Sequence, residues 1–320
     1  MTTLAPADPA SIVRAAEILR DGGLVAFPTE TVYGLGADAT SGWAVARIYD
    51  AKSRPSFNPL IAHVSDIDAA QREALLPEAA LTLAQAFWPG PLTLVAPAAP
   101  GGSVCDLARA GLPSVALRIP DHPVAMALIR AFGRPIAAPS ANRSGHVSPV
   151  TAAHVAEDLA GRVDMILDGG RTAAGLESTI VSFCADAPTL LRPGAIPREK
   201  IEKLLGQKLV APAHAEVTAP GMTASHYAPN ARLRLEAHEL IEGEAALDFG
   251  GRLSGRAPPG TVTIDLSPNG DLVEAAANLF ASLRELDARG VERVAVAHIP
   301  ERGLGEAIND RLRRAAAPKL

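Results

Sequence analysis

The sequence contains few cysteines and few aromatic residues. Its 320 residues include two cysteines, Cys105 and Cys184, and neither has neighbours of the kind that bind metals. This composition excludes a disulfide framework and a cysteine-based zinc site, and it favours a reducing compartment. Aromatic residues make up 4 % of the chain and hydrophobic residues 48 %, so the core must consist mainly of Ala, Val, Leu and Ile.

Long apolar runs and strong charge are also missing. No segment approaches the about 20 consecutive apolar residues that a membrane helix requires. The first residues, MTTLAPADPASIV, lack the basic start and apolar block of a secretory signal. The net charge of −5 and the pI near 5.9 argue against binding to bulk nucleic acid or anionic membranes, but they leave room for a local basic site. We expect a soluble cytoplasmic protein.

Two common nucleotide-binding signatures are absent or incomplete. No G-x-x-x-x-G-K-[ST] sequence is present, which excludes a P-loop. The stretch GLGADA, residues 34–39, fits the loose dinucleotide pattern, but Pro28 and several polar residues separate it from the preceding strand pattern. No well-placed acidic residue follows it. We therefore do not expect a nicotinamide cofactor.

Helix and strand patterns alternate along the chain and predict an α/β fold. Helices are predicted at 9–20, 42–52, 78–88, 123–132, 151–160 and 197–205, and strands at 23–27, 59–64, 91–97, 113–120, 135–142, 164–170, 178–183 and 189–194. The last three strands follow one another too closely for crossover helices, which favours a mixed sheet over a purely parallel one.

The predicted chain has two domains joined by a linker. Residues 1–205 form the larger domain, and residues 230–320 again alternate strand and helix as a small C-terminal α/β domain, Rossmann-like in pattern. Between them, residues 206–229 lose periodicity and gain Pro, Ala and Thr, which is typical of a linker. Loops of this length are often lids, so the segment is either a lid or a flexible tether.

Two cations lie at the end of the helix predicted at 42–52. Lys52 and Arg54 are two positions apart, and residues with this spacing share a face in an extended segment. Both side chains would then point into one pocket, where a planar guanidinium and a compact ammonium suit phosphate oxygens. Asn58 and His63 extend the polar line. The alternative is a solvated basic pair that the helix dipole favours at a C-terminus.

Polar residues also follow other predicted strands. Two strands end in proline followed by hydroxyl groups, at 27–31 and at 138–142, which predicts a crevice shared by both at one edge of the sheet; the alternative is an ordinary turn. Gly34 and Gly36 are expected to leave the backbone behind the first of them flexible. Arg118 and Arg192 each end a short apolar stretch just before proline. With Lys52 and Arg54 they suggest an anion-binding pocket, against the alternative of surface arginines.

Short motifs follow one another in the order typical of one family. In chain order they are PTETVYGLGADA, KSRPSFNPLIAH, WPGPLTLV, LRIPDH, APSANRSG, LESTIV and RPGAI. This order resembles the YrdC-like family, whose fold is a twisted mixed sheet with flanking helices. The linker PGMTASHYAP and the second domain make the chain similar to the two-domain threonylcarbamoyl-AMP synthases of that family. The resemblance is strong over 9–230 and loose over 231–320.

The resemblance implies an activity, its substrates and its partners. The family condenses L-threonine, bicarbonate and ATP into threonylcarbamoyl-AMP and pyrophosphate, a nucleotidyltransferase reaction that serves tRNA processing. A separate transferase complex then passes the threonylcarbamoyl group to adenosine 37 of tRNA. We expect no direct tRNA binding and no metal site built from protein side chains. Mg²⁺ is expected to arrive with the ATP phosphates.

The resemblance also implies roles for individual residues. Lys52 and Arg54 would be catalytic, through their positive charge. The residues implied in threonine binding are Thr31, His63, Arg118 and Ser178. Those implied in ATP binding are Arg54, Asn58, Ser114, Ser140, Asn142, Val150, Arg192 and Tyr227. Tyr227 lies in the linker, and we hypothesise that this segment folds over the nucleotide.

The chain departs from the family pattern in its linker, and two rival functions are weighed against the family's activity. Thr223, Ala224 and Ser225 stand where relatives often have basic and aromatic residues, which weakens the expected contact of the linker with the triphosphate. One rival function is a double-stranded-RNA-binding module, which the acidic pI disfavours. The other is a carbamoyltransferase of the hydrogenase-maturation type, for which this chain lacks the zinc-finger cysteines and the length.

Overall fold

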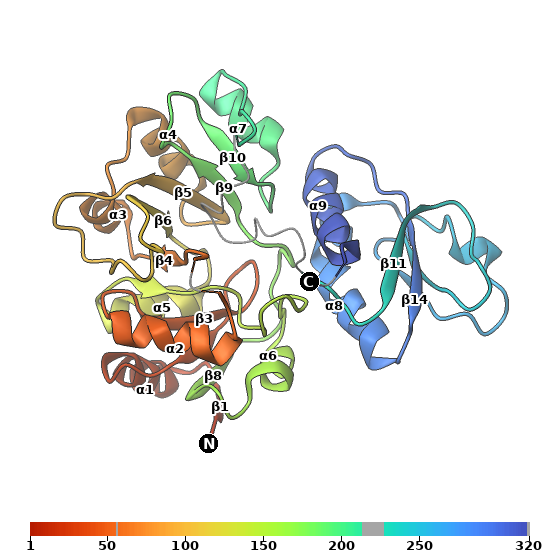
Figure 1. The fold of residues 1–320 in the computed structure, drawn as a ribbon, viewed down its shortest axis with the longest axis horizontal. Coiled ribbons are helices and arrows are strands. Elements are labelled where there is room, and N and C mark those ends of the chain that lie inside the picture. The colour runs from red at the N-terminus through yellow and green to blue at the C-terminus, as the bar shows by residue number, and fades with distance from the viewer. Residues whose placement is uncertain (56, 213–226, 319–320) are drawn as a thin grey trace.

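The computed structural model describes residues 1–55, 57–212 and 227–318, and it arranges them around two sheets. Figure 1 shows the larger sheet with its helices in one lobe and the smaller sheet with two long helices in the other. Across the described ranges, no helix has the length and apolar character that crossing a membrane requires.

The larger sheet has ten strands in the order β1-β8-β2-β3-β7-β4-β6-β5-β9-β10. β4 and β6 pair in parallel while β5 and β6 pair antiparallel, which confirms the predicted mixed sheet. The strands are β1 (Thr3–Pro6), β2 (Val25–Phe27), β3 (Gly34–Asp38), β4 (Ile61–His63), β5 (Leu92–Pro97), β6 (Ser114–Arg118), β7 (Ile136–Ala137), β8 (Met165–Asp168), β9 (Thr179–Ser182) and β10 (Thr189–Arg192).

Most helices of this lobe begin at a residue whose side chain caps them, whereas α4 and α7 begin after a proline without a side-chain cap. The carboxylate of Asp8 accepts a hydrogen bond from the Ser11 backbone N–H and precedes a proline at the first helical position of α1. The helices are α1 (Pro9–Arg20), α2 (Gly42–Lys52), α3 (Ile67–Glu73), α4 (Glu78–Phe87), α5 (Pro123–Phe132), α6 (Ala152–Leu159) and α7 (Arg198–Leu205). Each helix predicted in this part of the chain is present, and α3 is an additional one.

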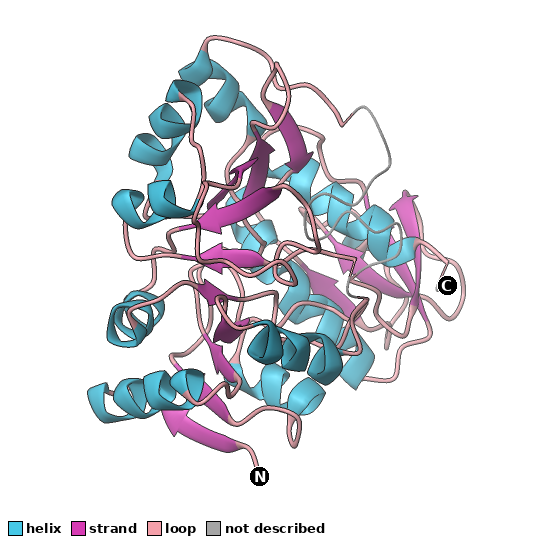
Figure 2. Cartoon of the chain, turned by 60° about the vertical axis from the view of Figure 1, so that its left-hand side comes forward, coloured by secondary structure: helices cyan, strands magenta, loops and turns pink. Residues whose placement is uncertain are grey.

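Helices cover both faces of the larger sheet, as Figure 2 shows from the side. Alternate residues of one strand therefore enter different cores. Val25 and Phe27 of β2 pack with α1 and α5, whereas Ala26 packs in a second core with α2, α4 and α6. A strand that is buried on both faces needs the nearly continuous apolar sequence seen here.

The glycines after the first predicted strand have a different role from the expected one. Residues Gly34–Asp38 form β3, which pairs antiparallel with β2, so this segment is regular strand. A Cβ atom on Gly36 would lie 2.8 Å from Cε1 of Phe27 and 2.9 Å from Cγ2 of Ile136. The glycine therefore permits close packing of neighbouring side chains, and the expectation of a flexible backbone was wrong.

The smaller sheet has four parallel strands in the order β11-β14-β12-β13. Its elements are β11 (Arg232–Ala237), β12 (Ala245–Asp248), the 3₁₀ helix η1 (Ser254–Arg256), β13 (Thr263–Asp265), α8 (Leu272–Ala288), β14 (Arg293–Ala297) and α9 (Leu304–Ala316). This arrangement agrees with the predicted small Rossmann-like unit. β11 was not among the predicted strands.

The two lobes share one apolar cluster. Val32, Val147, Val150 and Leu176 come from the first lobe, and they pack with α8, α9 and the strands of the second. Residues 206–212 of the predicted linker stay with the first lobe, because the Leu190 backbone N–H donates to the Val210 carbonyl oxygen at 2.9 Å. Linker residues 213–226, with the altered positions Thr223, Ala224 and Ser225, lie outside the described residues.

Candidate active site

A cavity in the larger lobe is lined by side chains from distant parts of the chain. Eight of its lining residues are among those implied by the sequence, namely Thr31, Arg54, His63, Arg118, Ser140, Ser178, Arg192 and Tyr227. Strand ends and the loops that follow them supply most of these side chains. The anion-binding pocket predicted from scattered cations is thus a contiguous surface, although Lys52 is not part of its lining.

The strand ends at 27–31 and 138–142 meet as predicted. The Leu35 backbone N–H donates to the Pro139 carbonyl oxygen at 2.8 Å, and Gly34 forms an antiparallel bridge with Ser140. The hydroxyl groups of Thr29 and Thr31 lie 2.7 Å apart, and the Thr29 hydroxyl also donates to the Val32 carbonyl oxygen. These contacts hold a short row of hydroxyl groups on one wall of the cavity.

Arg54 brings a buried positive charge to the cavity. Ser53, which ends α2, has a left-handed backbone conformation with φ of 51°, and this turn directs Arg54 into the pocket. One guanidinium nitrogen donates to the Pro59 carbonyl oxygen at 3.2 Å. Burial lowers the pKa of Arg54 to about 10, and the nearby charge of Arg192 acts in the same direction. Arg54 therefore stays cationic at neutral pH.

Lys52 lies beside the cavity without lining it. Its ammonium group donates to the backbone carbonyl oxygens of Ser140, at 2.6 Å, and of Asn142. The side chain is 1 % exposed, and burial together with the charge of Arg54 lowers the pKa of Lys52. The left-handed turn at Ser53 separates the two cations, so they do not share one face as an extended segment would require. Lys52 fixes the turn that presents Ser140.

His63 and Arg118 lie side by side because they are register partners in the parallel strands β4 and β6. Burial and the positive charge of Arg118 lower the pKa of His63 to about 3, so the imidazole is neutral near pH 7. The guanidinium of Arg118 donates to the Gly90 carbonyl oxygen at 3.3 Å and pairs with the Glu30 carboxylate at 2.5 Å. Glu30 is part of the motif PTETVYGLGADA, but the sequence predicted no role for it.

Arg192 and Ser178 form the opposite wall. The Arg192 guanidinium donates to the Ser178 carbonyl oxygen at 2.9 Å and to its hydroxyl at 3.1 Å. The Ser178 hydroxyl is also 2.7 Å from the hydroxyl of Thr93, a buried residue of β5 that the sequence did not single out. Burial lowers the pKa of Arg192.

Of the linker residues that the structure describes, Tyr227 lines the cavity. Its side chain is 1 % exposed, and its ring stacks on Phe280 of α8 with centroids 5.5 Å apart. The guanidinium carbon of Arg311, from α9, lies 5.2 Å from the centroid of the Tyr227 ring. Tyr227 therefore joins the cavity to the second lobe. The lid hypothesis also concerns residues 213–226, which lie outside the described part of the chain, and it stays a prediction.

The remaining predicted residues are not among those that line the cavity. Asn58 is 3 % exposed, and its backbone carbonyl accepts the Arg54 guanidinium at 3.4 Å. Ser114 begins β6, four residues before Arg118 on the same face of the strand. Asn142 and Val150 flank a loop that underlies the cavity, and Val150 is fully buried in the cluster shared by the lobes.

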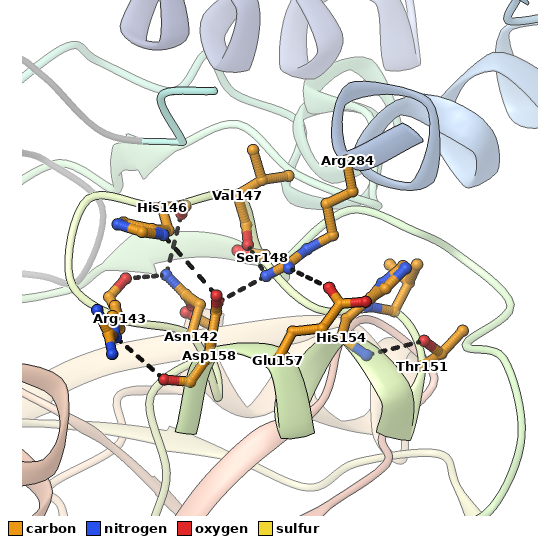
Figure 3. A network of polar contacts seen from close by, with 12 residues as sticks. Asn142, Arg143, His146, Val147, Ser148, Thr151, His154, Glu157, Asp158 and Arg284 are labelled. Carbon is orange, nitrogen blue, oxygen red and sulfur yellow. Dashed lines mark hydrogen bonds and ion pairs between the residues drawn. The ribbon is translucent and has the colours of Figure 1, made fainter. Parts of the chain in front are cut away.

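Figure 3 shows how this loop is held. The Asn142 side-chain amide donates to the Arg143 carbonyl oxygen at 2.6 Å and to the His146 carbonyl oxygen at 2.9 Å. Arg284 of α8 donates to the Val147 carbonyl oxygen at 2.6 Å and pairs with Asp158 at 2.7 Å. The second lobe thus contacts the loop that carries two residues implied in ATP binding.

Several buried polar atoms at the site have no hydrogen-bond partner among the described residues. They include Nε of Arg54, Oδ1 of Asn58, Nδ1 of His63 and Oδ1 of Asn142. These four make up half of the eight such atoms found in the described ranges. Buried polar groups are normally hydrogen-bonded, and leaving one unpaired costs about 1–3 kcal/mol. Their concentration here marks a site built for a polar ligand.

Comparison with known proteins agrees with this geometry. Residues 17–194 match the family model described as "Telomere recombination", and residues 196–317 match the one described as "Threonylcarbamoyl-AMP synthase, C-terminal domain". A threonylcarbamoyl-AMP synthase of Bacillus subtilis is 44 % identical over 332 aligned positions, which cover 98 % of this chain and 94 % of the relative. The chain belongs to the threonylcarbamoyl-AMP synthase family. The resemblance inferred from the motifs is confirmed.

Other members of the threonylcarbamoyl-AMP synthase family support the same placement. A Pyrococcus abyssi relative is 44 % identical, with 96 % of this chain and 94 % of the relative covered. The crystal structure of P. abyssi Sua5 complexed with L-threonine superposes with a TM-score of 0.88 at 40 % identity, covering 99 % of this chain and 97 % of that chain. The E. coli YciO structure, at 23 % identity and a TM-score of 0.54, shares the fold of the larger lobe.

Proposed function

We propose that the protein condenses L-threonine, bicarbonate and ATP into threonylcarbamoyl-AMP and pyrophosphate. The proposal rests on two findings that concern the same cavity. The chain matches threonylcarbamoyl-AMP synthases over nearly its whole length. The residues implied by the family motifs converge on a pocket lined by three buried arginines, Arg54, Arg118 and Arg192.

The threonine end of the pocket is formed by Thr31, His63, Arg118 and Ser178. Arg118 is 4 % exposed and offers a planar donor group suited to the threonine carboxylate. His63 is neutral and can take part in a hydrogen bond without adding charge. The P. abyssi relative that superposes on this chain was solved with L-threonine bound, which supports an amino-acid site in the same fold.

The ATP end is formed by Arg54, Ser140 and Arg192, with Tyr227 beside them. In the proposed reaction the threonine amine adds to bicarbonate-derived carbon dioxide and gives a carbamate. A carbamate oxygen then bonds to the α-phosphorus as the bond to the β-phosphate oxygen breaks, and pyrophosphate leaves with the electron pair. Two anions must approach each other, so fixed positive charge and positioning supply most of the acceleration.

The metal requirement is part of the proposal. Within the described ranges, no three His, Cys, Asp or Glu side chains group in a way that could hold a metal ion. The cavity lining is mainly cationic and hydroxylic, which suits a nucleotide better than a free divalent cation. Mg²⁺ is therefore proposed to enter on the ATP phosphates, with water as its other ligands, and to neutralise phosphate charge.

The product implies a partner downstream. Threonylcarbamoyl-AMP is a mixed anhydride that water hydrolyses, so a transferase must consume it for the tRNA modification. We propose that such a transferase complex uses this product and that the protein itself does not need to bind tRNA. The net charge of −5 supports this division of labour.

Pyrophosphate release tests the proposed function. We expect release from ATP only when L-threonine and bicarbonate are both present, with Mg²⁺ in excess of ATP. Omitting either substrate provides the matched control. Equal release in the absence of threonine would overturn the assignment. A filter-binding titration with double-stranded RNA at rising salt checks the rival function, for which tight binding with a steep salt dependence is expected.

A further inference from the structure

One buried side chain crosses from the smaller lobe to the wall of the cavity. Arg311 of α9 is 0 % exposed and is the largest fully buried side chain in the described chain. Its Nε donates to Oε2 of Glu177 at 2.8 Å, and its Nη2 donates to the Pro193 carbonyl oxygen at 3.0 Å. Its Nη1 pairs with Asp310 at 2.6 Å. All three guanidinium nitrogens therefore have partners.

Glu177 is the only carboxylate among the side chains that line the described cavity. Its second oxygen accepts a hydrogen bond from the Ser148 hydroxyl at 2.6 Å. Burial would raise the pKa of Glu177, but the charges of Arg311 and Arg192 and these hydrogen bonds lower it to about 2. A fully ionised carboxylate thus lies in a pocket whose proposed substrates are anions.

Two of the three acceptors of Arg311 are next to substrate-binding residues in the sequence. Glu177 precedes Ser178, and Pro193 follows Arg192. The two segments touch directly, because a Cβ atom on Gly194 would lie 2.4 Å from the Thr179 backbone nitrogen. The Ala195 backbone N–H also donates to the Glu177 carbonyl oxygen at 3.0 Å, and Arg311 adds a side-chain link because it binds one acceptor on each segment. Neither sequence motif indicated this, since Arg311 lies 134 positions after Glu177.

We propose that Arg311 is a positioning residue for the reaction in the cavity. It fixes the segments that carry Ser178 and Arg192, and it balances the charge of Glu177 so that the cavity stays attractive to ATP and threonine. The smaller lobe thereby completes the active site from behind. This inference rests on the proposed function and adds a role for the second lobe.

Removing the guanidinium has two expected consequences. In Arg311→Met, the buried Glu177 would lose its direct ion pair and keep only the charge of Arg192 and the Ser148 hydrogen bond, or it would take up a proton. The ionised carboxylate would repel the anionic substrates, because a buried charge that has lost its direct partner is strongly unfavourable. The protonated carboxyl would instead change the hydrogen bonds of the segment that carries Ser178. Arg311→Lys keeps the charge but cannot bind Glu177 and Pro193 with the same forked geometry, so its defect should be intermediate.

The test is a double-mutant cycle on Arg311→Met and Glu177→Gln. For each variant, kcat and KM for ATP and for threonine are measured together with the melting temperature. We expect Arg311→Met to lower kcat/KM for ATP by about tenfold or more, mainly through KM. Adding Glu177→Gln to Arg311→Met should recover part of the lost kcat/KM, because residue 177 then carries no negative charge.

Matched controls separate positioning from general stability. Arg198→Met removes another ion pair between the lobes, in which Arg198 Nε contacts Glu306 at 3.1 Å outside the cavity lining. Arg313→Met removes a surface ion pair from the same helix as Arg311. Both should change KM by less than about twofold, since exposed pairs contribute little. If Arg311→Met is insoluble, Arg311→Lys with and without Glu177→Gln replaces it in the cycle.

Two results would overturn the inference. In the first, the losses of the single variants multiply in the double variant. In the second, Arg311→Met lowers the melting temperature while KM and kcat of the folded protein match those of the wild type. The wild-type reaction distinguishes this failure from failure of the proposed function. If the wild type shows no threonine-dependent pyrophosphate release, calorimetric ATP binding to the same variants tests the positioning role directly.

Discussion

The cavity of the larger lobe and a hollow of the smaller lobe are both lined by arginine, but only the cavity buries those charges. In the larger lobe, Arg54, Arg118 and Arg192 are between 4 % and 8 % exposed. In the smaller lobe, a hollow at the carboxyl ends of β11 and β14 is lined by His238, Arg252 and His298 among others. Arg252 is exposed there, and the His298 side chain is 44 % exposed.

The partners of these groups differ in the same way. Arg252 donates to the His298 carbonyl oxygen at 2.9 Å, and the His298 ring pairs with Glu236 at 2.5 Å, close to solvent. Arg54 and His63 in the other lobe keep buried nitrogens that have no partner among the described residues. The hollow of the smaller lobe therefore resembles the cavity in its place on a sheet but not in the burial of its charges. Buried charge, which is costly without an anionic ligand, is the stronger indicator of a site.

The largest expected effect comes from deleting a buried cation. Arg54→Ala should lower kcat/KM by at least about tenfold, because losing one charge contact to a developing anion costs about 2–4 kcal/mol. Steady-state pyrophosphate release measures the loss, and circular dichroism confirms that the variant is folded. Turnover near that of the wild type would show that Arg54 contributes no more to the reaction than a surface arginine. The comparison between the buried and the exposed arginines would then fail.

A lysine at the threonine end should have a narrower effect. Arg118→Lys keeps the charge but loses the planar donor group, so we expect threonine to bind roughly tenfold more weakly while ATP binding changes little. Calorimetric titration with each ligand separates the two. A defect in ATP binding instead of threonine binding would mean that Arg118 belongs to the nucleotide end.

Substituting Lys52 tests whether this residue affects the reaction by positioning the backbone turn at Ser140. The substitution Lys52→Ala removes hydrogen bonds to two carbonyl oxygens, and we expect a loss of about tenfold that is reflected in KM for ATP as the turn at Ser140 relaxes. Lys52→Arg is the conservative control. A loss confined to kcat, with KM unchanged, would instead favour direct contact of the ammonium with the reacting groups.

The smallest effect is expected in the second sheet. The exposed Arg252 is predicted to be dispensable, so Arg252→Met should leave kcat and both KM values within about twofold of the wild type. The same pyrophosphate assay detects any change. A tenfold loss would show that the hollow beside β14 takes part in the reaction after all.

Most of the fold could be predicted because its signals are local. The helices of the larger lobe follow clear apolar periodicity, and caps such as Asp8 mark where they begin. β3 was missed because its glycines indicate turns in a sequence, whereas here they make room for Phe27. No local pattern distinguishes a glycine that bends the chain from one that lets neighbours approach.

Eight of the predicted residues line the cavity, but the geometry of the site could not be predicted. The family motifs name the residues, yet the direction of Lys52 depends on a left-handed turn at Ser53, a residue that rarely adopts that conformation. Glu30 and Glu177 acquire their roles from Arg118 and Arg311, which lie 88 and 134 positions away. Pairings over such distances follow from the tertiary fold and leave no local signature.

The apolar cluster shared by the lobes has a consequence for attempts to shorten the protein. Val32, Val147, Val150 and Leu176 are at most 6 % exposed, and they pack against residues of the smaller lobe. A fragment ending near residue 205 would lack the lobe that packs against these four side chains. The apolar surface exposed to solvent would favour self-association. Polar replacements at these positions would be required for a soluble minimal enzyme. Even then the back wall of its pocket would lack the guanidinium that now crosses from α9.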